Sequence, residues 1–336
     1  MYLDPLHAGS SLELYCDDRL IFSSSGKWLH PLFEAEDFIR KNGPFSGRLT
    51  LHDSISGLAA SVLTIRLGAA AVNIDMISTL ALKRYEKFGV EVHYKTLVDR
   101  IKCITETMIT PDMDQDEAYR LLRKKADLTS GLSLRIENLS FSYSGEKKII
   151  DSLNLYLEKG DAVILEGDNG CGKTTLLRLI AGLEKPDSGT IEYDGSLQRP
   201  SMGYIRQFTR AQDFPFSVRE VVALTLPKDT EDRQGEIELA LRRCGVYHLV
   251  DRAFFSLSGG EMAKVNLARC LASKARLLLF DEPVASLDKA SRIAFASIMA
   301  SLSVTEMPTM IIVNHDRLLT QALPWPVRRM EGGRIA

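Results

Sequence analysis

A glycine-rich loop with a lysine and two threonines carries the strongest chemical signal: Gly167-Asp-Asn169-Gly170-Cys171-Gly172-Lys173-Thr174-Thr175. It follows the apolar run 162–165, which predicts a strand, and precedes the apolar run 176–181, which predicts a helix. In such a setting the glycine amides curl around phosphate oxygens, and the helix N-terminus adds positive charge. Lys173 can reach the β- and γ-phosphates, and the Thr174 hydroxyl can ligate Mg²⁺. The loop therefore predicts that the chain binds a nucleoside triphosphate.

Two adjacent carboxylates, Asp281 and Glu282, follow the apolar run 277–280. A buried strand would deliver both of them to one edge of a sheet. Asp281 could hold Mg²⁺ through its water shell, and Glu282 could polarise an attacking water. An acidic turn after a core strand is the structural alternative, and the phosphate loop upstream favours the catalytic interpretation.

The run Leu257-Ser258-Gly259-Gly260-Glu261 opens a helical stretch, 262–273. Ser258 and Glu261 have capping-box spacing, which predicts a helix N-terminus there. Two glycines expose backbone amides where the helix dipole is positive, as an anion site requires. A well-capped helix without a ligand explains the run equally well on its own.

In this order, the phosphate loop, the Leu-Ser-Gly-Gly-Glu run and the Asp-Glu strand resemble the ATP-binding cassette ATPases over residues 132–336. The resemblance implies an α/β P-loop NTPase fold with a helical subdomain at about 208–258, and hydrolysis of ATP to ADP and phosphate with Mg²⁺. It implies that Gln207 reaches Mg²⁺ and the lytic water, and that His315 is the switch histidine. It also implies that Tyr143 stacks on adenine and that Ser286-Leu-Asp288 is the D-loop.

The same resemblance implies partners. The Leu-Ser-Gly-Gly-Glu run of one cassette completes the phosphate site of a second, so the chain is expected to pair head-to-tail when ATP binds. The run 213–222 resembles the helical subdomain of import-type cassettes, most of all metal-ion and metal-chelate importers, where the groove after Gln207 receives a membrane permease. Cys171 within the phosphate loop is read as a tolerated small residue, with redox inhibition as the alternative.

Composition limits the function classes. The 336 residues suit two domains at about 150 residues each, and the net charge is −2. A near-neutral chain shows no electrostatic footprint for nucleic acid. Five scattered cysteines and the absence of a signal-peptide pattern or membrane-spanning run favour a soluble, cytoplasmic chain. With the resemblance, this predicts an ATPase associated peripherally with the inner face of the membrane through its permease.

A second α/β domain is expected in residues 1–103. Its pattern predicts a hairpin around Asp17-Asp18, then helix 31–42, strand 48–51, helix 54–67, strand 71–74, helix 78–88 and strand 90–94, in the order ββαβαβαβ. Residues 104–131 are charged and are interpreted as a linker with one solvated helix.

The N-terminal part resembles a small uncharacterised family with a cytidine-deaminase-like fold. The resemblance rests on Ser23-Ser-Ser-Gly with His30-Pro-Leu, on Asp53-Ser-Ile-Ser-Gly57 and on Asp75-Met-Ile-Ser78. Zinc-dependent deamination is rejected, because no His-x-Glu precedes a Pro-Cys-x-x-Cys. The family's Cys-Pro-Met-Glu-like run reads Cys103-Ile-Thr-Glu106 here, which weakens any carried-over site. Asp53, Ser78 and Cys103 could line a small-ligand pocket, although capping and packing explain them as well.

The favoured hypothesis is thus the ATPase subunit of an ABC-type transporter, of import type, with a regulatory N-terminal domain. One alternative is a soluble cassette that remodels a nucleic-acid or protein complex. Another makes the N-terminal domain an enzyme that the cassette regulates, and the missing metal ligands argue against it.

Overall fold

The computed structural model describes residues 2–143, 145, 147–206 and 215–335. Its internal contacts divide the chain into two units, 1–128 and 129–336. Gln207, the expected lytic-water ligand, lies outside the described residues. Within the described parts, every helix is too short or too polar to cross a bilayer.

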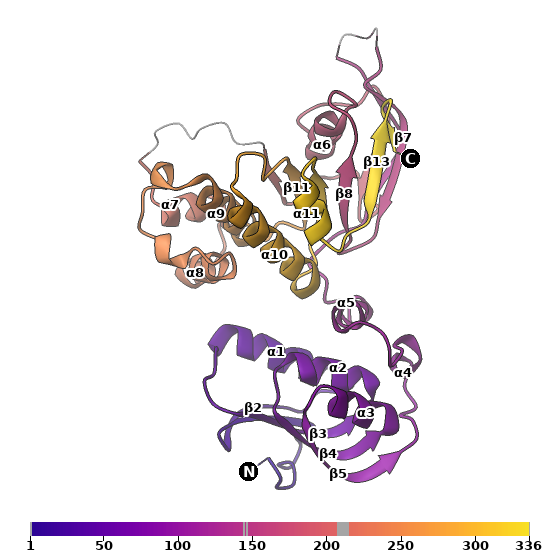
Figure 1. Cartoon of the computed structure of the whole chain (residues 1–336), viewed down its shortest axis with the longest axis vertical. Coiled ribbons are helices and arrows are strands. Elements are labelled where there is room, and N and C mark those ends of the chain that lie inside the picture. The colour runs from indigo at the N-terminus through magenta and orange to yellow at the C-terminus, as the bar shows by residue number, and fades with distance from the viewer. Residues whose placement is uncertain (1, 144, 146, 207–214, 336) are drawn as a thin grey trace. The chain divides into compact units, whose positions relative to one another are not determined.

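Unit 1 is built on a five-stranded sheet in the order β2-β1-β3-β4-β5. Its elements are β1 (Leu12–Cys16), β2 (Arg19–Ser24), α1 (His30–Asn42), β3 (Leu49–Ser56), α2 (Leu58–Arg66), β4 (Ala71–Ser78), α3 (Thr79–Lys87), β5 (Glu91–Val98), α4 (Thr105–Met108) and α5 (Gln115–Lys125). β1 is antiparallel to both neighbours, whereas β3, β4 and β5 are parallel and connected through helices. Figure 1 shows α1 and α2 on one side of this sheet. The order ββαβαβαβ expected from the sequence is confirmed.

Two local expectations in unit 1 differ from the structure. The predicted strand 48–51 continues to Ser56, so α2 starts at Leu58 rather than at residue 54. The strands predicted at 71–74 and 90–94 likewise extend to Ser78 and Val98. Each extension adds polar residues to a strand, and pairing in the sheet satisfies backbone groups of these residues.

The expected linker helix is part of unit 1. α5 contacts α2 and buries Ala118, Tyr119, Leu122 and Arg123. The Tyr119 hydroxyl donates to the Glu36 carboxylate of α1 at 2.6 Å. Residues 104–128 therefore complete the first unit, which corrects the expected boundary at 103. The buried positions recur at helical spacing and form a stripe along one face of α5. The helix carries many charges, so its overall composition does not reveal this stripe.

Unit 2 contains the remaining elements. They are β6 (Leu134–Phe141), β7 (Ile150–Leu157), β8 (Ala162–Glu166), α6 (Lys173–Ala181), β9 (Ser188–Tyr193), β10 (Met202–Ile205), α7 (Val218–Ala223), α8 (Arg233–Arg243), the short 3₁₀ helices Tyr247–Leu249 and Phe254–Ser256, α9 (Gly259–Ala272), β11 (Leu277–Asp281), α10 (Lys289–Thr305), β12 (Thr309–Val313), α11 (Arg317–Ala322), β13 (Val327–Glu331) and β14 (Arg334–Ile335). β6, β7 and β9 form a small antiparallel sheet.

The central sheet of unit 2 has the order β10-β11-β12-β8-β13-β14, and its strands are parallel except β14. Every residue of β11 and β12 is buried, as expected for strands covered on both faces. Because β8, β12 and β11 are parallel neighbours, their carboxyl ends meet at one edge of the sheet. That edge carries the residues that the sequence analysis singled out for chemistry.

The helical part of unit 2 consists of α7 and α8 packed on α9, and Figure 1 shows the three gathered on one side of the unit. The expected helical subdomain, about 208–258, thus ends directly before α9 begins at Gly259, and its helices pack on α9. Of that range, residues 208–214 lie outside the described residues.

Candidate functional site

The phosphate loop has the strand–loop–helix geometry that its sequence predicts. β8 ends at Glu166 and α6 begins at Lys173. Gly172 precedes α6 with φ +110°, and no side chain caps the amides of the first turn. Gly167 has φ +150°, and a Cβ there would lie 2.2 Å from the Met330 carbonyl oxygen. The loop therefore requires glycine at both ends and leaves uncapped amides that favour an anion.

Lys173 is folded into the loop that precedes it. Its ammonium donates to the carbonyl oxygens of Gly167 at 2.7 Å and Asp168 at 2.9 Å. The Cys171 sulfur lies 3.8 Å from the same nitrogen. The lysine charge is thus placed inside the curl of the loop, where a phosphate would bind. Asn169 and Gly170 are exposed on the loop.

Thr174 and Asp281 form a hydroxyl–carboxylate pair. Thr174 Oγ1, in the first turn of α6, donates to Asp281 Oδ1 at 2.9 Å, and Asp281 ends the buried strand β11. A hydroxyl and a carboxylate are hard oxygen ligands at one point, so these residues fit Mg²⁺. Thr175, the next residue of α6, is buried instead.

Tyr204 also belongs to this cluster, although its sequence context did not indicate a role. Its hydroxyl donates to Asp281 Oδ2 at 3.3 Å. Burial and the neighbouring Asp281 charge raise the pKa of Tyr204 to about 12, so it stays a neutral donor. β10 pairs with β11, so Tyr204 lies opposite Leu279, and strand pairing is the information that could have placed it there.

Glu282 and His315 meet at the same sheet edge. They follow the paired strands β11 and β12, and His315 Nε2 lies 3.5 Å from Glu282 Oε1. Glu282 has the left-handed φ of +51°, and its amide donates to the Val313 carbonyl at 3.0 Å. A non-glycine residue at positive φ is strained, and such strain is concentrated at functional sites.

A cavity of about 200 Å³ adjoins this pair and includes Arg292, Asn314 and Asp316 in its lining. Arg292 forms an ion pair with Asp316 and also donates to the Leu287 carbonyl at 2.8 Å. Arg292 therefore connects the loop after Glu282 to the loop that carries His315. Arg292 could not be identified from the sequence, because a single arginine within a helix has no distinctive motif.

The Leu-Ser-Gly-Gly-Glu run forms the predicted capping box. Ser258 Oγ accepts from the Glu261 amide at 3.3 Å, and Glu261 Oε2 accepts from the Ser258 amide at 2.8 Å. The hydrogen bonds that the Glu261 carboxylate accepts from the Ser258 amide and hydroxyl lower the pKa of Glu261. Gly259 is exposed, whereas a Cβ on Gly260 would lie 2.5 Å from Ser291 Oγ. Figure 1 shows α9 and α6 on opposite sides of β11, so a single chain does not bring this run to its own phosphate loop.

The other expected residues lie in simpler surroundings. Tyr143 is 58% exposed and makes an edge contact with the Phe141 ring at 4.9 Å between centroids, which leaves a ring face open. Asp288 caps α10 and accepts from the Ser291 amide at 2.9 Å, and this hydrogen bond lowers its pKa.

The family model of the ABC transporter matches residues 150–285, from β7 past Glu282. The molybdate import ATP-binding protein MolC of Haemophilus influenzae is 34% identical over 191 residues, covering 55% of this chain and 73% of MolC. This chain belongs to the ABC transporter ATP-binding cassette family. An aliphatic sulfonates import protein, SsuB of Ralstonia nicotianae, is 36% identical over 61% of this chain and 72% of its own length.

Solved structures agree with this cassette. A metal-chelate type ABC transporter in an inward-facing conformation matches with a TM-score of 0.54 at 30% identity, over 61% of this chain and 82% of that one. CbiO1 of Clostridium perfringens, described as part of the transporter complex CbiONQ, matches with a TM-score of 0.55 at 28% identity, over 60% and 86%. Unit 2 is an ATP-binding, ATP-hydrolysing cassette, and the expected P-loop fold is confirmed.

The three candidate residues of unit 1 separate in the structure. Asp53 and Cys103 line one cavity. Ser78 caps α3 and accepts from the Ala81 amide at 3.2 Å. Its role is therefore explained by helix capping.

Proposed function

We propose that the chain is the ATPase subunit of an importer and that it couples ATP-driven pairing of two cassettes to a separate membrane permease. The observation that carries the proposal is the site at one sheet edge, where the Thr174–Asp281 pair and the Glu282–His315 pair come together. The import direction is supported by the names of the relatives, which are molybdate and sulfonate import proteins.

In this mechanism the loop amides and the Lys173 ammonium bind the phosphates of ATP. Thr174, Asp281 and Gln207 would hold Mg²⁺, which neutralises charge on the phosphate oxygens when it is bound. The exposed ring face of Tyr143 stacks on adenine.

Glu282 orients a water molecule by accepting a hydrogen bond from it, and it receives the proton as the water attacks. His315, within 3.5 Å of the Glu282 carboxylate, holds that carboxylate in place and senses the phosphate. The Arg292–Asp316 ion pair fixes the loop behind both residues.

The second half of the site comes from a second copy. We place the exposed Ser258–Gly259 end of α9 and the Asp288 loop of the partner against the phosphates bound by the first copy. The capping box fixes the first turn of α9 as a helix, so backbone amides of that turn point the same way and can donate to an anion.

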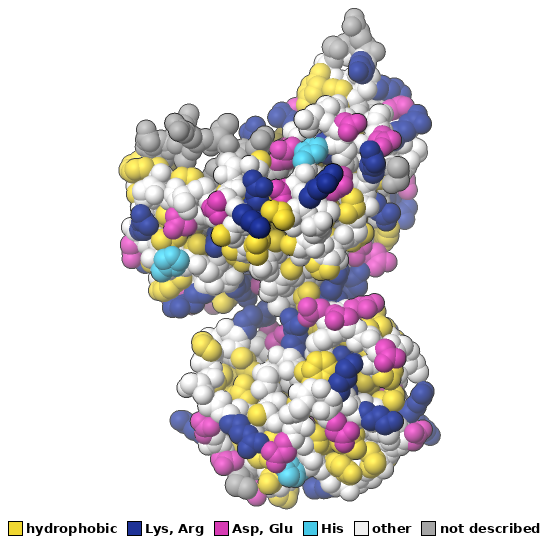
Figure 2. All heavy atoms as spheres, in the orientation of Figure 1, with side chains coloured by type: hydrophobic (Ala, Val, Ile, Leu, Met, Phe, Trp, Pro, Cys, Tyr) yellow, Lys and Arg dark blue, Asp and Glu magenta, His cyan; other side chains and the backbone are white. Residues whose placement is uncertain are grey.

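The membrane partner is proposed to dock in the groove after Gln207, next to α7, α8 and α9, which places the chain on the cytoplasmic face of the membrane. The alternative is a soluble cassette that remodels a nucleic-acid or protein complex. On the face shown in Figure 2, acidic and basic side chains are interspersed over both units, which does not favour nucleic-acid binding on that face.

Capture of the tagged full chain from detergent-solubilised membranes tests the proposal. We expect a protein with several membrane-spanning segments to copurify. The importer hypothesis would be wrong if no membrane protein were captured and nucleic acid stimulated the ATPase activity.

For unit 1 we propose a cytidine-deaminase-like fold with a regulatory rather than a deaminating role. The mixed sheet covered by helices, in the order ββαβαβαβ, supports the fold. His52 would be a candidate zinc ligand if unit 1 were a deaminase. It is fully buried, and its Nε2 lies 3.4 Å from Asp75 Oδ1.

A further inference from the structure

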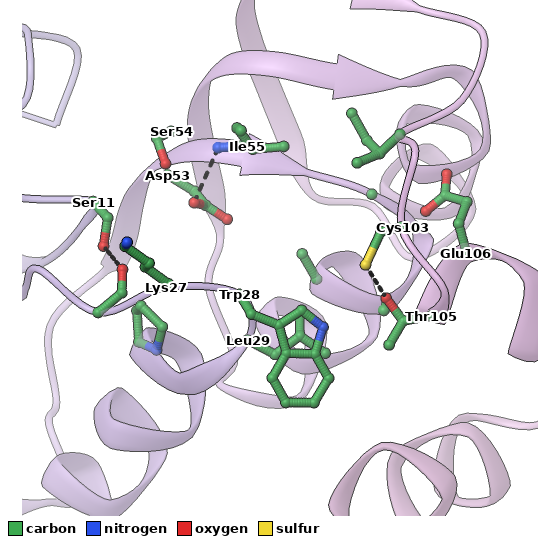
Figure 3. Close-up of a pocket in the computed structure, with 16 residues that line it drawn as sticks. Ser11, Lys27, Trp28, Leu29, Asp53, Ser54, Ile55, Cys103, Thr105 and Glu106 are labelled. Carbon is green, nitrogen blue, oxygen red and sulfur yellow. Dashed lines mark hydrogen bonds between the residues drawn. The ribbon is translucent and has the colours of Figure 1, made fainter. Parts of the chain in front are cut away.

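Unit 1 contains a cavity of about 360 Å³ that is separate from the nucleotide site. Its walls come from the β2–α1 loop, β3, the start of α2 and the segment after β5, and include Trp28, Leu29, Asp53, Ala59, Cys103 and Glu106. In Figure 3 the Asp53 carboxyl and the Cys103 thiol lie on opposite sides of the cavity, with the Trp28 indole below them. The volume lies within the range of small-ligand pockets, about 300–1,000 Å³.

Asp53 is a buried carboxyl group, and among the residues that the structure describes no cation forms an ion pair with it. It is 7% exposed, and Oδ1 accepts from the Ile55 amide at 3.2 Å. Burial raises its pKa to about 7, and the neighbouring Asp75 charge acts in the same direction. A carboxylate at this position is costly unless a donor or a cation compensates it.

The opposite side of the cavity also offers acceptors. Glu106 is 5% exposed, and its Oε2 accepts from the Leu58 amide at 2.8 Å. Its Oε1 has no hydrogen-bond partner among the residues that the structure describes. Buried polar atoms are rarely left unpaired, so this side of the cavity also favours a ligand that brings donors.

Trp28 supplies an aromatic surface at the cavity. It is 41% exposed and has a left-handed φ of +60°. A bulky residue held in this strained conformation with its ring partly in solvent indicates a binding role more than a packing role. Aromatic faces attract organic cations.

We propose that this cavity binds a small organic cation, an amine or amidine with an apolar body. The cationic group lies against Asp53, and the body lies between the Trp28 indole and the apolar wall formed by Leu29 and Ala59. Lys27 also lines the cavity, but it is exposed, so water and salt screen its repulsion of a bound cation.

The two tryptophans allow a direct test in the full chain, because Trp28 lines the cavity whereas Trp325 is buried in unit 2. The chain labelled with 5-fluorotryptophan is titrated with benzamidine, agmatine and phenethylamine and followed by ¹⁹F NMR. We expect at least one of these cations to shift the Trp28 resonance saturably and to leave the Trp325 resonance in place. Benzamide and benzoate, which are neutral and anionic analogues of benzamidine, should bind at least about tenfold more weakly than benzamidine does.

Charge variants distinguish the proposal from an anion site. Asp53→Asn should weaken cation binding at least about tenfold, whereas Lys27→Ala and the exposed control Asp18→Asn should leave it unchanged. Cys103→Met, which fills the cavity from the other side, should also weaken binding and serves if Asp53→Asn does not fold. The proposal is overturned if none of the three cations shifts Trp28, or if benzoate binds best and Lys27→Ala abolishes its binding.

Discussion

Glu282 and His315 show how the fold makes a site from two unremarkable turns. Each residue follows a buried strand, and the parallel pairing of β11 with β12 brings their side chains to 3.5 Å. The sequence order of the motifs predicted both residues. The contacts of Tyr204 and Arg292 could not be predicted, because they depend on strand order and on the path of a loop.

Glu282→Gln should lower ATPase activity by about 10²–10⁴-fold, because the amide cannot accept the proton of the attacking water. ATP affinity should be retained, since Glu282 is not among the groups proposed to bind the phosphates. Steady-state phosphate release and equilibrium nucleotide binding measure the two effects. Glu331→Gln, an exposed change in β13, is the matched control and should keep full activity. Near-normal turnover of Glu282→Gln would show that a residue other than Glu282 accepts the proton of the attacking water.

Asp53 should make the stability of unit 1 depend on pH. Its folded-state pKa of about 7 lies above the ordinary value, so the folded state favours the protonated carboxyl. The contribution of this carboxyl to the free energy of unfolding is therefore fully present below about pH 4 and is lost as the pH rises towards 7. The stability of the native chain relative to Asp53→Asn should therefore fall by roughly 1.4 kcal/mol per pH unit across this window. Urea unfolding followed at Trp28 measures the difference. A difference independent of pH would show that Asp53 titrates normally.

At the scale of elements, the order of strands and helices in both units follows from the apolar periodicity, but several boundaries do not. α2 starts at Leu58 because the carboxylate of Glu106, distant in sequence, accepts the Leu58 amide. Gly57 leaves room for that carboxylate, since a Cβ there would lie 2.4 Å from Glu106 Oε2. A boundary set by a distant side chain cannot be read from local spacing.

Glu106→Ala should destabilise unit 1 by about 1–3 kcal/mol, because the Leu58 amide in the first turn of α2 loses its buried acceptor. Glu86→Ala, an exposed change in α3, should have a much smaller effect. Thermal and urea unfolding of both full-length variants compare them. Equal stabilities would mean that Glu106 does not cap α2.

The capping boxes of α7 and α9 form a natural comparison. Ser217 caps α7 as Ser258 caps α9, in each case with a glutamate three residues later. Either serine replaced by alanine should cost about 1 kcal/mol of stability. Only Ser258→Ala should also lower ATPase activity, by at least about tenfold, because it disorders the first turn of α9, which we propose meets the phosphates bound by the partner copy. Similar activity in the two variants would show that the Ser258 run only caps α9 and does not contribute to the nucleotide site.

At the scale of the whole molecule, the motif order predicted the division into an ATPase unit and a smaller α/β unit. The first unit runs to Leu128 and includes α4 and α5, beyond the expected boundary at 103. The apolar stripe of α5 lies among many charges, so the composition of this segment resembles that of a linker. The 208–214 part of the predicted helical subdomain and Gln207 lie outside the described residues, so the roles given to them stay predictions. The cavity in unit 1 was anticipated through Asp53 and Cys103, while Trp28 and Glu106 enter it only through the tertiary fold.

Sedimentation velocity of the full-length Glu282→Gln chain shows whether two copies share each nucleotide site. With ATP and Mg²⁺ we expect a shift from one 37.4 kDa copy to a species of twice that mass. ADP should leave single copies, and the additional change Ser258→Arg should prevent pairing without loss of ATP binding. If the chain binds ATP to saturation and still sediments as single copies, the nucleotide site is not shared between two copies.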